Sequence, residues 1–234
     1  MTIFLMGQNR WIDETSWPPE GTEQRDYYLM GGGAANSING DGRLIVEPPA
    51  RERPDVYTYD PLFPVPSAGG HSGFVPVVAS MGPADQAGVE ILNGVLVYTS
   101  APLEEDLTVI GPVSVILYAA TSAPDTDFTS KLCVVSPEGR STNIQEGIIR
   151  ARHRQSSTDP RPIMPDEVYE YRIDLALPPT SSRPAIVFVY RSLAAISPSG
   201  IGTSTSVVHS ALKVSRTREL RPKPSCTTPT IPPA

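Results

Sequence analysis

The 234-residue sequence predicts an all-β protein, arranged as an antiparallel β-sandwich. Runs rich in β-branched and aromatic residues recur about every 8–20 residues, and turns rich in glycine and proline separate them. The chain contains 26 prolines and 18 glycines, which argues against long helices. Its contents of 39% hydrophobic and 19% charged residues are typical of a globular domain with a sizeable core.

The expected strands follow one another along the chain, and the central stretch 95–154 holds four of them in succession. Within 108–119, Val113, Val115 and Leu117 alternate with Ser114 and Ile116, which is the period of a strand. Residues 2–6 are apolar on both faces, as in a buried parallel strand. The expected strands cover residues 2–6, 27–29, 44–46, 95–99, 108–119, 128–135, 147–154 and 168–175.

A long loop at 67–83 contains Gly70-His71-Ser72-Gly73, which is superficially similar to the nucleophile elbow of serine hydrolases. The Gly-x-Ser-x-Gly pattern would need glycine at position 74, where Phe74 stands, and it would need a helix directly after the turn. We therefore do not expect Ser72 to be a nucleophile. No other nucleophile, base and orienting group form a set along the chain, so the sequence predicts no catalytic residue.

Other candidate sites have simpler structural explanations. Asp125 and Asp127 flank a turn between strands, where carboxylates usually cap backbone N–H groups. Arg150, Arg152 and Arg154 would share one face of a strand, which favours a solvated or domain-facing surface. Cys133 lies among apolar residues and is expected in the core. The three histidines and two cysteines show no metal-ligand spacing, so neither a metal nor a cofactor is expected.

The net charge of −6 gives no reason to expect nucleic acid as a partner. The N-terminus lacks a signal peptide, and no run of 18 apolar residues occurs, so the sequence favours a cytoplasmic protein without a membrane segment. Assembly into a homo-oligomer stays open. The charge is unevenly spread, because seven basic residues and one acidic residue follow residue 177, giving −12 before that point and +6 after it.

Several short segments, taken in order, resemble one family: the C-terminal domain of X-Pro dipeptidyl-peptidase-like serine hydrolases. This is the CocE/NonD group, which includes cocaine esterase and α-amino-acid ester hydrolase. The resemblance covers about residues 3–177. It rests on Phe4-Leu5-Met6-Gly7, Arg10-Trp11, Ser16-Trp17-Pro18, Tyr59-Asp60-Pro61, Pro64-Val65-Pro66, Gly69-Gly70, Gly82-Pro83-Ala84-Asp85-Gln86, Leu96-Val97-Tyr98-Thr99-Ser100, Gly111-Pro112-Val113, Asp125-Thr126-Asp127-Phe128, Lys131-Leu132, Pro137-Glu138-Gly139-Arg140 and Gly147-Ile148-Ile149-Arg150-Ala151-Arg152.

The resemblance implies a jelly-roll β-sandwich of the galactose-binding-like type, attached to an α/β-hydrolase catalytic domain. In this family the Ser–Asp–His triad lies upstream of the strand at residues 2–6, so no catalytic residue transfers to this chain. Residues 1–10 would be the last strand of the hydrolase domain, and 11–177 the jelly roll. The family also implies that a loop resembling 69–74 lines the substrate site, which makes Phe74 and His71 the candidate substrate-contacting residues.

The resemblance stops after Leu177. Family members continue with segments such as Gly-His-Arg-Ile-Arg-Val, whereas this chain has Ala185-Ile186-Val187-Phe188-Val189. The codons GGC CAT CGT ATT CGT GTA, read from their second base, encode Ala-Ile-Val-Phe-Val. Our hypothesis is that residues 178–234 are translated out of frame. We then expect a disordered tail, a sandwich incomplete at its C-terminal end, and a chain of low stability.

Two functions follow from these observations. The first is the C-terminal module of an ester- or X-Pro-peptide-cleaving serine hydrolase, present as a fragment without the catalytic triad. The alternative is a stand-alone galactose-binding-like module that binds a carbohydrate or a protein. Carbohydrate sites need exposed aromatic side chains on a concave surface, whereas Trp11 and Trp17 are expected in a linker.

Overall fold

The computed structural model describes residues 1–6, 9–50, 53–60, 62–71, 81–104, 107–175, 185–188, 192–197 and 203–217. Strands make up nearly all of the regular structure in these ranges, so the all-β prediction is confirmed. The strands are β1 (Thr2–Met6), β2 (Arg10–Asp13), β3 (Thr22–Met30), β4 (Arg43–Ile45), β5 (Asp55–Tyr59), β6 (Leu96–Ser100), β7 (Leu107–Thr121), β8 (Asp127–Val135), β9 (Ser141–Arg150), β10 (Tyr169–Asp174), β11 (Ala185–Phe188), β12 (Ser192–Ser197) and β13 (Thr203–Thr217).

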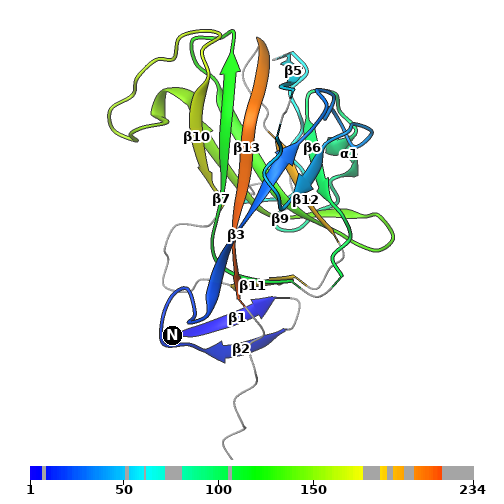
Figure 1. Ribbon diagram of the computed structural model, residues 1–234, viewed down its shortest axis with the longest axis vertical. Helices are drawn as coiled ribbons and strands as arrows, with labels where there is room; N and C mark the ends of the chain where they lie inside the picture. Colours follow the sequence, from blue (N-terminus) through cyan, green and yellow to red (C-terminus); the bar gives the residue numbers. More distant parts are fainter. Residues whose placement is uncertain are drawn as a thin grey trace, which may run out of the picture.

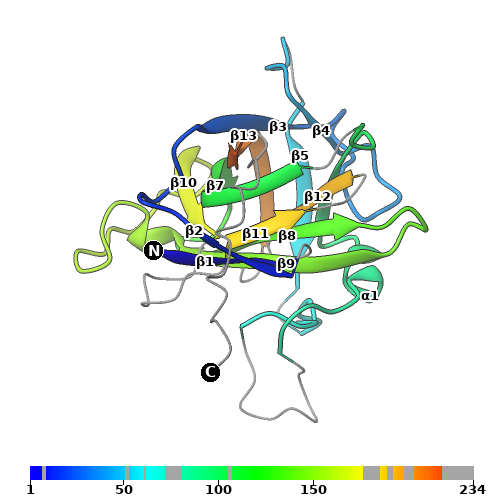
Figure 2. The same ribbon diagram turned by 90° about the horizontal axis from the view of Figure 1, so that it is seen from below.

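The strands form one strongly bent sheet whose order is β2-β1-β11-β7-β13-β3-β4-β6-β12-β8-β9. In addition, β10 pairs with β7 and β5 pairs with β13. β7 and β13 run side by side along the long axis of the molecule (Figure 1). Seen from below, β3 and β4 lie on the opposite side of the molecule from β8 and β9 (Figure 2). This arrangement is consistent with a sandwich; the jelly-roll connectivity stays a prediction.

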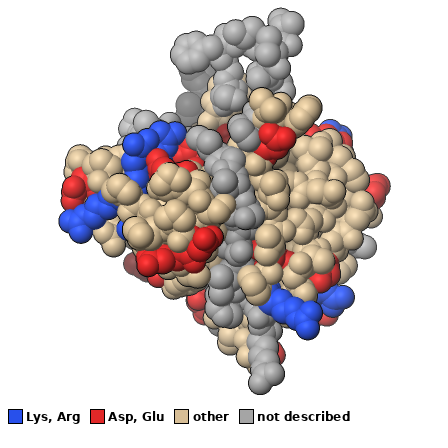
Figure 3. Space-filling view, turned by 90° about the horizontal axis from the view of Figure 1, so that it is seen from above, with Lys and Arg blue, Asp and Glu red and all other residues tan. Residues whose placement is uncertain are grey.

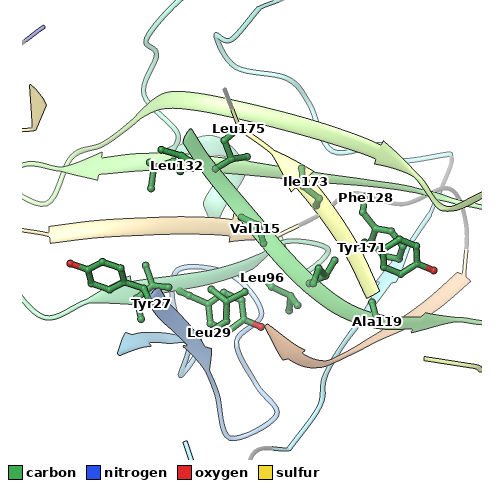
Figure 4. Packing of buried hydrophobic residues seen from close by; sticks show 14 of the residues in the cluster. Tyr27, Leu29, Leu96, Val115, Ala119, Phe128, Leu132, Tyr171, Ile173 and Leu175 are labelled. Carbon is green, nitrogen blue, oxygen red and sulfur yellow. The ribbon is translucent and has the colours of Figure 1, made fainter. Parts of the chain in front are cut away.

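The main hydrophobic core lies between these layers (Figure 4). Val115 and Leu117 of β7 point into it, as the alternating pattern predicts, and are 2% and 1% exposed. Phe128 of β8 and Tyr171 of β10 meet there with ring centroids 4.5 Å apart. β8 and β10 therefore contribute to the same core although about forty residues separate them in the chain.

The N-terminal strand belongs to this sheet, and the expected domain division at residue 10 stays a prediction. β1 pairs with β2 in antiparallel register across that boundary and with β11 in parallel register. Ile3 and Leu5 are buried against Ile110 of β7. On the other face of β1, Phe4 packs on Trp11 with ring centroids 4.9 Å apart. This second contact explains why the strand is apolar on both faces, and it puts Trp11 on β2 rather than in a linker.

The tail also differs from the expectation. We predicted that residues 178–234 are disordered, yet 185–188, 192–197 and 203–217 form strands β11, β12 and β13. β13 lies between β7 and β3, and β12 lies between β6 and β8, so the sheet is not open at these positions. The physical reason is that main-chain N–H and C=O groups make these pairs, and any extended chain supplies them. Pairing of this kind does not depend on the reading frame that encodes the side chains.

The prediction that Arg150, Arg152 and Arg154 share one face of a strand is wrong. β9 ends at Arg150, and a 3-10 helix, η1 (Ala151–His153), follows it. Arg150 forms a two-bond ion pair with Asp127, at 2.7 and 2.8 Å. Asp125 accepts the backbone N–H of Arg152 at 3.0 Å and pairs with its guanidinium. Asp125 therefore caps a backbone N–H group, as predicted, whereas Asp127 binds the Arg150 side chain instead.

The surface charges are scattered. On the face shown in Figure 3, Lys and Arg side chains form small separate groups and no continuous basic stripe, in keeping with the net charge of −6. In the part of the chain that the structure describes, no helix is long and apolar enough to cross a membrane.

Helix α1 (Ala87–Glu90) ends on a buried carboxyl group that should make stability depend on pH. Glu90 is 2% exposed, and the Ser141 hydroxyl donates to its Oε1 at 2.5 Å. Burial raises the pKa of Glu90 above its ordinary value of 4.5, while the bond from Ser141 lowers it and nearby Asp85 raises it further. Folding therefore favours the protonated carboxyl, and this contribution to stability is lost as the pH rises from 4.5 through the folded-state pKa.

Accordingly, Glu90→Gln should remove this loss, so that the variant gains stability relative to the parent chain as the pH rises. Urea unfolding at pH 4, 5.5 and 7 measures the difference. Ser141→Ala is the matched control, because it removes the bond that lowers the pKa and should steepen the decline. An equal pH dependence of the parent chain and Glu90→Gln would contradict the assignment.

Candidate functional site

The described residues on either side of 72–80 meet on the outer side of β8 and β9. The described chain before and after that segment lies beyond β9, on the side away from β3 and β4 (Figure 2). Gly70 N–H donates to the Gly82 carbonyl at 2.8 Å, and Gly82 N–H donates back to Gly70 at 2.9 Å. This reciprocal pair fixes the separation of the two ends. We call the two ends the loop stems, residues 68–71 and 81–86.

The first stem needs its two glycines. Gly69 and Gly70 have φ values of 66° and 91°, in the left-handed region that other residues rarely adopt. A side chain at Gly69 would collide with the Gly82 carbonyl oxygen, and one at Gly70 with the Glu146 carboxylate. The Gly-Gly pair therefore allows the stem to approach β9 closely.

Gln86 joins both stems to β9. Its side chain is fully buried, and its amide nitrogen lies 3.0 Å from the Ala68 carbonyl and 2.9 Å from the Ala84 carbonyl. The same nitrogen lies 3.1 Å from Oδ1 of Asn143, which also accepts the backbone N–H of Ala84 at 2.7 Å. A single buried amide thus connects residue 68, residue 84 and the middle of β9.

A charged group of residues lies next to this amide. Glu146 Oε1 accepts the backbone N–H of His71 at 2.7 Å and lies 3.3 Å from the His71 ring nitrogen Nδ1. Lys131 Nζ lies 3.7 Å from the other Glu146 oxygen, and it donates to the Ala68 carbonyl at 3.2 Å and to Gln86 Oε1 at 3.3 Å. The Lys131 and Glu146 side chains are only 15% and 22% exposed, so solvent screens this pair less than a surface pair.

We call Gln86, Lys131, Asn143 and Glu146 the anchor platform. They connect the loop stems, one of which contains Gln86 itself, to Lys131 of β8 and to Asn143 and Glu146 of β9, which lie 45 to 75 residues later in the sequence. The arrangement holds the two loop stems in one orientation against β8 and β9. It also aligns the His71 ring, because Glu146 contacts both its backbone and its Nδ1.

Of the two candidate residues, the structure describes one. His71 lies on the first stem, its side chain 44% exposed, with Nδ1 turned to Glu146. Phe74 lies outside the described residues, as does Ser72. In the described ranges, no group of three or more His, Cys, Asp or Glu side chains could hold a metal ion.

The sequence interpretation missed the platform. Gln86 and Lys131 lie within segments that carry the family resemblance, Gly82–Gln86 and Lys131-Leu132, so a signal existed for both. Asn143 and Glu146 gave none, because polar residues are common along the strands of an antiparallel sheet. Their partners become visible only once the loop stems are folded against β9.

Residues 1–183 match the X-Pro dipeptidyl-peptidase C-terminal non-catalytic domain. The chain belongs to this family. It is 41% identical over 177 residues to the cocaine esterase of Rhodococcus sp. strain MB1 Bresler, which is 74% of this chain and 30% of the esterase. It is also 32% identical over 169 residues to a protein of Mycobacterium tuberculosis named as a serine esterase, covering 72% of this chain and 25% of that protein. The chain thus spans less than a third of the length of these relatives.

Solved structures agree on the fold. An aminopeptidase from a marine sediment Thaumarchaeota archaeon aligns with a TM-score of 0.73 and 24% identity, over 93% of this chain and 40% of that one. An α-amino acid ester hydrolase aligns with a TM-score of 0.70 and 20% identity, over 92% and 40% of the two chains. The expected family is confirmed: the chain is a C-terminal non-catalytic domain of the CocE/NonD hydrolase type.

Proposed function

We propose that this domain serves a serine hydrolase by packing on an α/β-hydrolase catalytic domain and lending residues 69–74 to the wall of the substrate site. The observation that carries the proposal is the anchor platform. A loop that only connects strands needs no buried amide, no ion pair and no paired glycines at its stems. Rigid stems do make sense for a loop whose side chains must meet a substrate, because a preorganised contact costs less entropy on binding.

The bond cleaved is an ester in this proposal. The relatives with more than 30% identity are named as esterases, and together they support ester hydrolysis over X-Pro peptide cleavage. Within the wall, Phe74 supplies an apolar contact and His71 a polar one. Glu146 holds the His71 ring through Nδ1 and leaves the other ring nitrogen for the substrate.

The proposal is tested in a chimera: the Rhodococcus cocaine esterase with its matching 177-residue segment replaced by the corresponding residues of this chain. We expect the chimera to hydrolyse a 4-nitrophenyl ester. Phe74→Ala should raise its KM about tenfold with a smaller change in kcat, since a lost aromatic contact weakens binding by about 1–2 kcal/mol. His71→Ala should raise KM less.

Phe63→Ala is the matched control, because Phe63 is 80% exposed and lies outside the 69–74 segment. Its KM should stay within about twofold of the unmodified chimera. Equal effects of Phe63→Ala and Phe74→Ala, or no effect of either, would reject the wall assignment.

A further inference from the structure

A pocket separate from the anchor platform opens between β3, β4 and the segment that joins β6 to β7. Its volume is about 640 Å³. Small-molecule sites commonly have volumes of roughly 300–1,000 Å³, so the pocket could hold a ligand the size of one to three amino acids. None of its lining residues belongs to the loop stems or the platform.

The floor of the pocket is the main core itself. Tyr27, Leu44 and Leu107 line it and are only 3%, 3% and 4% exposed. Tyr27 lies at the edge of the core cluster, with its hydroxyl pointing away from the other labelled residues (Figure 4). Protein interiors are normally close-packed, so an opening that reaches three core side chains lets the apolar part of a ligand contact them.

The rim of the pocket carries both signs of charge. Arg25 lines it from β3, with its guanidinium 5.7 Å from the centre of the Tyr27 ring. Glu47 and Glu104 line it from the chain after β4 and after β6. Among the ion pairs of the described residues, none joins Arg25 to either glutamate. Opposite charges that share a pocket without pairing are complementary to a ligand that carries both charges.

We propose that this pocket binds a zwitterionic molecule with an apolar body, such as an apolar amino acid or a short apolar peptide. The ligand's carboxylate pairs with Arg25, and its ammonium group pairs with Glu47 and Glu104. Its apolar body covers Tyr27, Leu44 and Leu107. A carboxylate or an amine alone would leave one of the rim charges without a partner. The site is independent of the hydrolase proposal, because its lining includes no residue of the loop stems.

Three probes with the same aromatic body test the ligand class: phenylalanine, phenethylamine and 3-phenylpropanoate. Titration calorimetry on the full chain at low salt and 10 °C measures each dissociation constant. We expect phenylalanine to bind about twofold to fivefold more tightly than either singly charged probe, since one partly exposed ion pair contributes about 0.5–1 kcal/mol. Phenethylamine or 3-phenylpropanoate binding as tightly as phenylalanine overturns the proposal, and so does no binding of phenylalanine at about 10 mM.

Two rim variants assign the charges. Arg25→Gln should weaken phenylalanine to the level of phenethylamine and leave phenethylamine unchanged. The double variant Glu47→Gln/Glu104→Gln should weaken phenylalanine to the level of 3-phenylpropanoate. Arg172→Gln is the control, because Arg172 is 62% exposed on β10 and does not line the pocket. Rim variants that behave like Arg172→Gln overturn the proposed site even if phenylalanine binds.

Discussion

Gln86→Ala should weaken both the fold and the substrate site. Its amide nitrogen is the shared donor to the Ala68 and Ala84 carbonyls and to Asn143. Alanine would remove three hydrogen bonds, two of them partly buried and one fully buried, at a cost of about 1 kcal/mol or more each. We therefore expect the free energy of unfolding to fall by about 3 kcal/mol or more.

In the chimera, the same substitution should raise KM for the 4-nitrophenyl ester by about tenfold, because the loop stems lose their common anchor. Kinetics are measured well below the melting temperature, so that every variant is folded during the assay. Gln145→Ala is the matched control. Gln145 has the same side chain as Gln86 and lies on β9, two residues after Asn143. The structure shows no side-chain hydrogen bond for it among the described residues.

The control should change stability by no more than about 0.5 kcal/mol and leave KM unchanged. A Gln86→Ala chimera that is less stable but keeps its KM would show that the platform stabilises the sandwich without positioning the substrate wall.

If residues 178–234 are out of frame, as we propose, a one-base shift after codon 177 should stabilise the domain. The match to the family ends at residue 183. Close to that point the charge balance also reverses, because residues 1–177 carry a net charge of −12 and residues 178–234 carry +6. β13 occupies a central position between β7 and β3. Strands in such positions are usually rich in apolar β-branched and aromatic residues, yet residues 203–217 contain four serines together with Lys213 and Arg216.

We propose that these residues occupy strand positions that family residues would fill better. Three additional well-packed apolar side chains would contribute about 5 kcal/mol, which raises the melting temperature of a domain of this size by about 10–20 °C. Thermal unfolding of the chain with a one-base shift after codon 177 measures the gain. The opposite one-base shift is the control and should give no gain. Sequencing the gene at this codon provides an independent check: if no single-base shift encodes the missing segments, the hypothesis fails.

The local part of the fold could be predicted from the sequence. The alternation around Val115 and Leu117 identified β7 and its core face, because the period of a strand is a property of neighbouring residues. The prediction of a strand face for the three arginines failed because η1 ends the strand after Arg150, and the periodicity contains no signal for that turn. The prediction of a disordered tail failed because main-chain hydrogen bonds can pair strands whose side chains do not show the alternating pattern.

The candidate site could be predicted only in part. The family resemblance pointed to residues 69–74 and to His71, but not to the anchor platform that positions the loop stems. Asn143 and Glu146 look like ordinary polar positions on β9, and their role depends on partners about 60 to 75 residues earlier in the chain. No local pattern encodes a contact of that range.

We propose that this domain supports ester hydrolysis without supplying the catalytic residues. The most direct measurement compares 4-nitrophenyl ester hydrolysis by the isolated chain and by the chimera. We predict background rates for the isolated chain and a chimera whose kcat/KM lies within about tenfold of the parent esterase. Hydrolysis by the isolated chain that Ser72→Ala abolishes would contradict the claim, as would a folded chimera without activity.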